Sequence, residues 1–300
     1  MTKKKKNNVP IALRIISFLF PKLEIISPFL ANRLAVQLFH RPFRFKPTIP
    51  EKKAAEQAEK FKIKINKKNI QVYTWGEGKP VLMVHGWSGR GTQFRKFIKP
   101  FNDHGLKVIA IDGPAHGKSE GSSAHAREFV ETVVKLQEVY GEFESLIGHS
   151  FGGVVNINCV HYGVAVKKLI LIASPTIAED IIADFLEKIN ASAERGLYFK
   201  QWLFRKNGVH FEDASIYALA DQIPDIPILV IHDEEDRDVP IHHAEVLKGK
   251  LPHIELYKTK GLGHLRILKD KAVINKCVDF IIGESSPEIE IQSSDAESRF

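Results

Sequence analysis

Cysteine is scarce in this chain of 300 residues, which contains only Cys159 and Cys277. Two cysteines cannot form a disulfide framework or a cysteine-rich metal site, so a reducing compartment, the cytoplasm, is the expected location. No run of about 18 uncharged apolar residues occurs, which argues against a transmembrane helix. The phosphate-binding motif G-x-x-x-x-G-K-[ST] and the zinc motif H-E-x-x-H are also absent. The sequence therefore predicts no cofactor and no metal ion.

Acidic residues are few at the start of the chain, and this asymmetry shapes the expected partners. Residues 1–68 hold 17 Lys and Arg against 4 Asp and Glu, whereas residues 69–300 hold 26 against 32. A nucleic-acid-binding protein would be expected to carry basic residues among aromatic ones on its folded body. The nearly neutral body seen here instead favours an enzyme that acts on a small molecule, and no nucleic-acid partner is expected.

Residues 1–64 are expected to form a basic and apolar helical appendage followed by an extended connector over residues 41–64. Four lysines, Lys3 to Lys6, precede an apolar stretch. A signal peptide fits poorly, because Arg14 splits the apolar core and no Ala-x-Ala cleavage site follows. Two interpretations remain open: short amphipathic helices that pack on the body, or a surface anchor that makes peripheral contact with anionic lipid.

Strand-like and helix-like segments alternate over residues 65–283, the predicted catalytic domain. This alternation is typical of a mostly parallel central sheet with helices on both faces. The C-terminal segment, 284–300, is rich in Ser and Glu and is expected to be a disordered acidic tail. The expected strands are 69–75, 80–84, 107–111, 145–147, 168–172 and 228–231, and the expected helices are 124–140, 152–161, 242–251 and 269–282.

The segment Gly148-His149-Ser150-Phe151-Gly152-Gly153 matches G-x-S-x-G and follows a strand-like segment directly. A nucleophile elbow requires a strand, a serine in a strained turn and then a helix, with glycines where a Cβ would collide with neighbouring backbone. All three parts are present. A match of this length alone is weak, and a glycine-rich turn with an inert serine is the alternative.

An unactivated serine is a poor nucleophile, so a base and an orienting acid must follow it in the chain. A run of acids, Asp233 to Asp238, comes directly after the last buried strand. His264 lies further on in a loop with glycine on its N-terminal side, before the final helix. The oxyanion would be held by two backbone N–H groups, those of Phe151 after the serine and of Trp87 in the loop after an earlier strand.

At these positions the sequence resembles the α/β-hydrolase superfamily over about residues 69–283. The matching motifs are His85-Gly86-Trp87, Asp112-Gly-Pro-Ala-His-Gly-Lys-Ser119, the elbow, the stretch 232–240 and Gly263-His264. The pattern H-G-x-x-D-x-x-V-P of the family implies Asp236 as the acid, with Asp238 and Glu235 as alternatives, and Asp233 replaces its glycine. His85 and His149 are then assigned to the oxyanion loop and the elbow rather than to a metal.

The resemblance also implies a helical cap inserted over residues 176–222. Aromatic side chains are dense in this segment, and Trp202 and Phe204 are predicted to contact substrate; packing against the sheet without touching substrate is the alternative. The sequence thus predicts a serine hydrolase that cleaves a carboxylic ester through the triad Ser150, Asp236 and His264. An acyltransferase with the same triad and a non-catalytic, membrane-associated binding module are the alternatives. The sequence does not indicate an oligomeric state.

Overall fold

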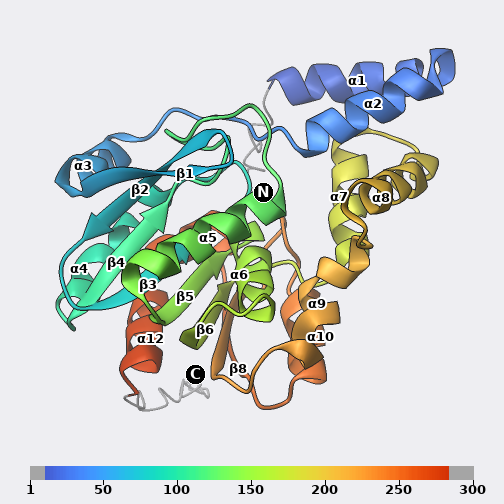
Figure 1. Ribbon diagram of the computed structural model, residues 1–300. Helices are drawn as coiled ribbons and strands as arrows, with labels where there is room; N and C mark the ends of the chain where they lie inside the picture. Colours follow the sequence, from blue (N-terminus) through green and yellow to red (C-terminus); the bar gives the residue numbers. More distant parts are fainter. Residues whose placement is uncertain (1–10, 284–300) are drawn as a thin grey trace, which may run out of the picture.

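An eight-stranded sheet forms the centre of the computed structural model, which describes residues 11–283 (Figure 1). The strand order is β1-β2-β4-β3-β5-β6-β7-β8; β2 runs antiparallel to β1 and to β4, and all other neighbours are parallel. The α/β-hydrolase fold with a mostly parallel sheet is therefore confirmed. The strands are β1 (Glu59–Ile65), β2 (Lys68–Trp75), β3 (Lys79–Val84), β4 (Leu106–Ile111), β5 (Phe143–His149), β6 (Val166–Ile172), β7 (Ile228–Asp233) and β8 (Glu255–Thr259).

Helices cover both faces of the sheet, because successive strand residues point to opposite sides. Leu82 and Val84 of β3 pack into one apolar core with α5, α6, α9 and α10, whereas Val81 and Met83 pack into the other with α4 and α12. The helices of this body are α3 (Ile49–Gln57), α4 (Ile98–Asn102), α5 (Ala126–Tyr140), α6 (Phe151–His161), α9 (Ile216–Leu219), α10 (His242–Lys250), α11 (Gly263–Arg266) and α12 (Lys271–Ile282).

The extended connector expected over residues 41–64 is wrong in its second half. Residues 49–57 form helix α3, with Pro50 in its first turn and Glu51 closing a capping box with Thr48. Residues 59–65 form β1, one of the two edge strands of the sheet. Charged side chains alternate with apolar ones along β1, which is typical of a half-exposed edge strand; the density of lysines concealed this alternation in the sequence.

The segment between β6 and β7 leaves the sheet and forms the helices α7 (Ala178–Ile189) and α8 (Ala193–Asn207), followed by shorter turns. We call α7 and α8 the cap. The N-terminal helices α1 (Ile11–Ile26) and α2 (Pro28–Phe39) lie side by side and pack on α7 and α8, well away from the sheet (Figure 1). Of the two interpretations of the appendage, packed helices are therefore what the described residues form. Across residues 11–283, none of the helices combines the length and the hydropathy needed to cross a bilayer. The lysines at 3–6 and the acidic tail lie outside the described residues.

Candidate active site

Ser150 lies in the turn between β5 and α6, with φ 54° and ψ −123°. Positive φ is uncommon for a residue with a side chain and costs conformational energy. The turn is tight because a Cβ at Gly152 would lie 2.0 Å from the carbonyl oxygen of Val84, so only glycine allows α6 to approach β3 this closely. The predicted arrangement of strand, strained serine and helix is confirmed.

The loop after β3 passes directly beside this serine. A Cβ at Gly86 would lie 2.8 Å from the Cβ of Ser150. Within the described residues, neither the N–H of Trp87 nor the N–H of Phe151 donates a hydrogen bond, and the two rings meet edge to face at 5.4 Å. Two free backbone donors next to a serine are suited to binding a developing oxyanion.

Two buried histidines hold this loop in place. His85 donates from Nδ1 to the carbonyl of Gly86 (2.7 Å) and accepts at Nε2 from the N–H of Gly113 (2.9 Å). His116 accepts at Nε2 from the N–H of Ser88 (3.0 Å). Burial lowers the pKa of His85 to about 4 and that of His116 to about 3, so both rings are neutral at pH 7. The predicted role of His85 as a support of the loop is confirmed.

Acid is expected to destabilise the protein from about pH 6.5 downward. These imidazoles stay neutral in the folded state, whereas the unfolded chain protonates them near pH 6.5. The unfolded state then binds more protons, so the free energy of unfolding falls as the pH drops from about 6.5 towards the lowered folded pKa values. Replacing His116 by Gln removes one such group while leaving an acceptor for Ser88. Urea unfolding between pH 7.5 and 4.5 should therefore show a shallower pH dependence for His116→Gln than for wild type and for the exposed-site control His253→Gln; parallel curves would contradict this account.

The acid and the base of the predicted triad are in contact. Nδ1 of His264 lies 2.8 Å from Oδ2 of Asp236. Oδ1 of the same carboxylate accepts the N–H groups of Asp238 (2.9 Å) and Val239 (3.0 Å). Burial opposes ionisation of Asp236, but the hydrogen bond from His264, together with those from Val239 and Asp238, outweighs it and holds the pKa of the carboxyl below its usual value. The carboxylate therefore accepts Nδ1–H, which leaves Nε2 of His264 without a proton and able to act as a base.

His149 connects His264 to the elbow; the structure places His264 in the short helix α11 rather than in the predicted loop. Its Nε2–H donates to the backbone carbonyl of His264 (2.8 Å), and the two ring centroids are 4.7 Å apart. Burial and the neighbouring His264 lower the pKa of His149 to about 3, so the ring remains a neutral donor. His264 thus lies beside the residue that precedes Ser150. The hydroxyl of Ser150 makes no hydrogen bond to the described residues, and such contacts often tighten only with substrate bound.

Asp233 has a role in this site that was not predicted from the sequence. Its buried carboxylate accepts the hydroxyl of Thr259 (2.8 Å), the N–H of Leu262 (2.9 Å) and the N–H of Glu235 (3.0 Å). Burial alone would raise its pKa, but hydrogen bonds from the 259–263 loop lower it. Asp233 therefore ties the end of β7 to the loop 259–263, which leads into α11 and His264 and is called the His264 loop below. The departure from glycine at this position is the signal that could have found it.

Removing the Asp233 carboxylate is expected to lower both stability and turnover. In Asp233→Ala the hydroxyl and the two N–H groups lose their buried acceptor, which costs about 1–3 kcal/mol of unfolding free energy, and the His264 loop loses its anchor. The stability and turnover of Asp233→Asn should lie between those of Asp233→Ala and wild type, since the amide oxygen of asparagine remains as an acceptor. Chemical denaturation and kcat for an aryl ester measure the two effects. Glu234→Gln, an exposed neighbour, should be neutral in both assays; an Asp233→Ala variant as stable and active as wild type would disprove the anchoring role.

The two predicted substrate-contact residues lie on α8 of the cap. Trp202 packs against His40, with ring centroids 5.6 Å apart, and lines a surface hollow of about 360 Å³ between α2 and α8. Phe204 is 42% exposed and stacks on His210 at 4.3 Å. The structure therefore places Trp202 against the N-terminal helices and Phe204 on the outside of the cap. Their contact with substrate stays a prediction.

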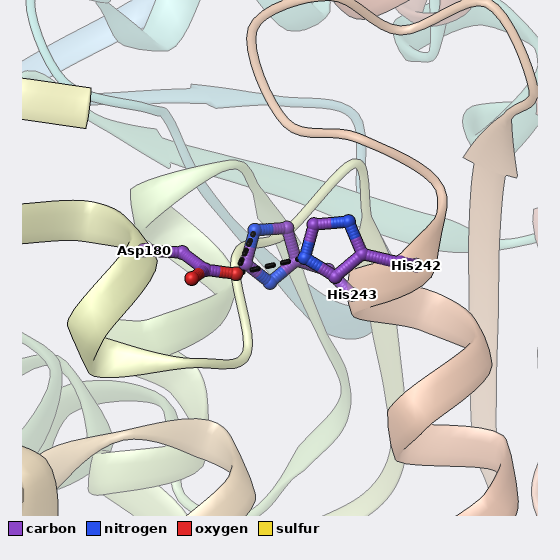
Figure 2. A group of neighbouring side chains, drawn as sticks. All are labelled: Asp180, His242 and His243. Carbon is purple, nitrogen blue, oxygen red and sulfur yellow. Dashed lines mark hydrogen bonds and ion pairs between the residues drawn. The ribbon is translucent and has the colours of Figure 1, made fainter. Parts of the chain in front are cut away.

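A second group of titratable side chains joins the cap to the body (Figure 2). Asp180 of α7 points towards two histidines of α10, with its Oδ2 at 2.7 Å from Nε2 of His242 and 3.7 Å from Nε2 of His243. The spacing would suit a metal ion. However, Nδ1 of His243 accepts the N–H of Thr176 (3.2 Å), which leaves the ring proton on Nε2, where a metal would have to bind. We therefore interpret the group as a polar contact between α7 and α10.

Comparison with known proteins identifies the family. The model of the alpha/beta hydrolase family matches residues 81–276, and the chain belongs to this family. The AB hydrolase superfamily protein YisY of Bacillus subtilis is 24% identical over 68% of this chain and 91% of its own length. The pimeloyl-[acyl-carrier protein] methyl ester esterase of Vibrio cholerae is 30% identical over 33% of this chain and 38% of its own length. The crystal structure of the Pyrococcus furiosus esterase Pf2001 superimposes with a TM-score of 0.61 at 19% identity, covering 81% of this chain and 98% of that one, and shows the shared fold.

Proposed function

We propose that this hydrolase is a serine carboxylesterase that works through an acyl-enzyme intermediate. The observation that carries the proposal is the 2.8 Å contact between His264 and Asp236. His264 lies in the short helix α11, and His149 of the elbow bonds to its backbone carbonyl. This arrangement gives a base with a free Nε2, and the ring of this base contacts His149, the residue before a serine that the backbone presents in a strained turn. A relative of the chain, the Vibrio cholerae protein, is named a methyl ester esterase, which supports ester chemistry.

The proposed reaction has two steps. Ser150 attacks the ester carbonyl as Nε2 of His264 takes its proton, and the N–H groups of Trp87 and Phe151 bind the oxyanion. Collapse of the tetrahedral intermediate expels the alcohol, which receives the proton from His264. Water then attacks the acyl-enzyme with His264 as base, which releases the acid and restores Ser150. Asp236 holds the imidazole in the required tautomer and stabilises the imidazolium throughout.

Activity-based labelling tests this proposal before any substrate is known. A fluorophosphonate should phosphonylate Ser150, and mass spectrometry of the digest should place the adduct on that residue. His264→Ala should abolish the labelling, because the hydroxyl is not activated without its base. Modification of another serine, or equal labelling of His264→Ala, would refute the assignment.

An acyltransferase would share this triad and differ only in the acceptor. Hydrolysis is the better supported proposal because the family match and the named relatives are hydrolases and esterases. Product analysis with an added alcohol or amine distinguishes the two: an esterase releases mainly the free acid, and an acyltransferase releases mainly the acyl-transferred product.

A further inference from the structure

Large apolar side chains are concentrated on the outer surface of helices α1 and α2. Residues 11–283 include nineteen exposed large hydrophobic residues, and eight of these fall within residues 11–30. We call these eight the outer apolar face. They are at least 49% exposed and comprise Ile11, Ile15, Phe18, Leu19, Ile25, Ile26, Phe29 and Leu30.

The folding of the helix pair does not require this face, because the opposite face is already buried. Phe20, Ala31 and Ala35 pack with Ile189 of α7 in a separate small core. The helix pair already has its own core, so a further apolar surface that is exposed to solvent indicates an external partner.

Polar contacts fix the helix pair on the cap and leave the outer apolar face exposed. Glu24 of α1 accepts from the hydroxyl of Ser192 (2.8 Å) and pairs with Arg195 of α8 (3.3 Å). Arg195 also donates to the side chain of Asn32 in α2 (2.8 Å). These contacts join both N-terminal helices to the cap and give the face a fixed direction.

Charge on the helix pair identifies the partner. Arg14, Lys22 and Arg33 are exposed, and none of them forms an ion pair with a described residue. Lys22 lies over the ring of Phe18, with its Nζ 4.0 Å from the ring centroid. The only acid of α1 and α2, Glu24, is half-buried and neutralised by Arg195. The outer surface therefore combines apolar side chains with unbalanced positive charge.

We propose that the outer apolar face docks on the surface of an anionic lipid bilayer. Amphipathic helices with cations beside large apolar residues bind at the boundary between headgroups and acyl chains. A second copy of the chain fits less well, since it would bring two positively charged surfaces together. The sequence adds Lys3 to Lys6 just before these helices. This proposal concerns binding and does not depend on the proposed esterase activity.

Docking would bring the cap next to the lipid. The helix pair packs on α7 and α8, and the hollow between α2 and α8 is lined by Phe29 and Arg33 together with Trp202. Apolar rings and a guanidinium in the same hollow suit a lipid acyl chain and its phosphate. A lipid-dissolved ester would therefore meet the cap side of the protein first.

Vesicle sedimentation with the full chain tests the proposal. Binding is expected to vesicles in which phosphatidylcholine is mixed with the anionic lipid phosphatidylglycerol, and to be at least tenfold weaker to phosphatidylcholine alone. The triple variant Phe18→Gln, Ile25→Gln and Phe29→Gln keeps every cation and should lose binding to anionic vesicles at least tenfold. The matched control, Val139→Gln with Tyr162→Gln, replaces side chains of similar exposure on α5 and after α6 and should bind like wild type.

Three outcomes would overturn the proposal. Wild-type binding by the triple variant would show that charge alone attracts the protein. Failure of wild type to bind anionic vesicles at an ionic strength of about 0.1 M, where charges still act over about 10 Å, would exclude the bilayer. Light scattering that shows a dimer of wild type, lost in the triple variant without any vesicle binding, would assign the face to a second copy.

A site-specific probe gives a readout that does not depend on the triple variant folding. Both native cysteines are buried, so an environment-sensitive dye attached through Ile25→Cys reports on that position. Its emission should shift to the blue with anionic vesicles, because residue 25 is 85% exposed in the free protein and would enter the apolar boundary. The same dye at Val139→Cys should not shift; equal shifts at both positions would contradict docking through α1.

Discussion

Ser150→Ala is expected to lower hydrolysis of a short-chain aryl ester by about 10⁶-fold, while the midpoint of thermal unfolding stays nearly unchanged. The loss is large because the nucleophile, the base and the acid of a catalytic triad act as a unit. No other group supplies the attacking oxygen in the proposed mechanism. Stability is unaffected because the hydroxyl makes no hydrogen bond to the described residues. Steady-state kinetics and thermal unfolding of wild type and variant measure the two quantities.

The same substitution separates catalysis from lipid binding. Ser150 lies at the carboxyl end of β5, whereas the outer apolar face is on α1 and α2. Ser150→Ala should therefore sediment with anionic vesicles as wild type does. Retention of full esterase turnover by the variant would end the proposed mechanism and leave the docking proposal intact. Loss of vesicle binding together with turnover would instead indicate that the two surfaces are coupled.

Much of the geometry of the candidate site was predictable from the sequence because it depends on short segments. The elbow around Ser150 is one short stretch of chain, and the loop with Trp87 follows its strand directly. Both are set by local backbone geometry, for which glycines and strand ends are visible signals. The pairing of Asp236 with His264 spans 28 residues, and it was reached through the family pattern rather than through local geometry.

What the sequence did not reveal depends on contacts between distant segments. Asp233 takes its role from a loop some 26 residues away. Its departure from the family's glycine marks the position, but nothing local shows that its carboxylate will be buried and bonded to that loop. β1 was hidden because an edge strand can carry a charge at every second position. The direction of the outer apolar face depends on Glu24 meeting Arg195. These two residues lie far apart in the chain, so periodicity along α1 cannot predict their contact.

Asp236→Asn is expected to reduce kcat for the aryl ester by about 10⁴-fold, with little change in stability. The backbone decides the orientation of the new amide. The N–H groups of Asp238 and Val239 need an acceptor, so the amide oxygen must take the place of Oδ1 and the NH₂ group must face His264. That NH₂ donates to Nδ1, which moves the ring proton to Nε2, and a protonated Nε2 cannot accept the proton of Ser150.

Asp238→Asn is the matched control for this prediction. Asp238 is exposed, belongs to the same run of acids and has no hydrogen bond to His264, although its carboxylate lies within 4.8 Å of a ring nitrogen of that histidine. Its replacement should change kcat by less than about threefold, since an exposed charge acts weakly through solvent. The rate of fluorophosphonate labelling should fall with kcat in Asp236→Asn and stay at the wild-type value in Asp238→Asn. The opposite result, in which only Asp238→Asn is inactive, would move the acid to position 238. Because the backbone N–H groups of residues 238 and 239 keep their acceptor in Asp236→Asn, a large drop in its unfolding midpoint would show that Asp236 supports the fold rather than the tautomer of His264.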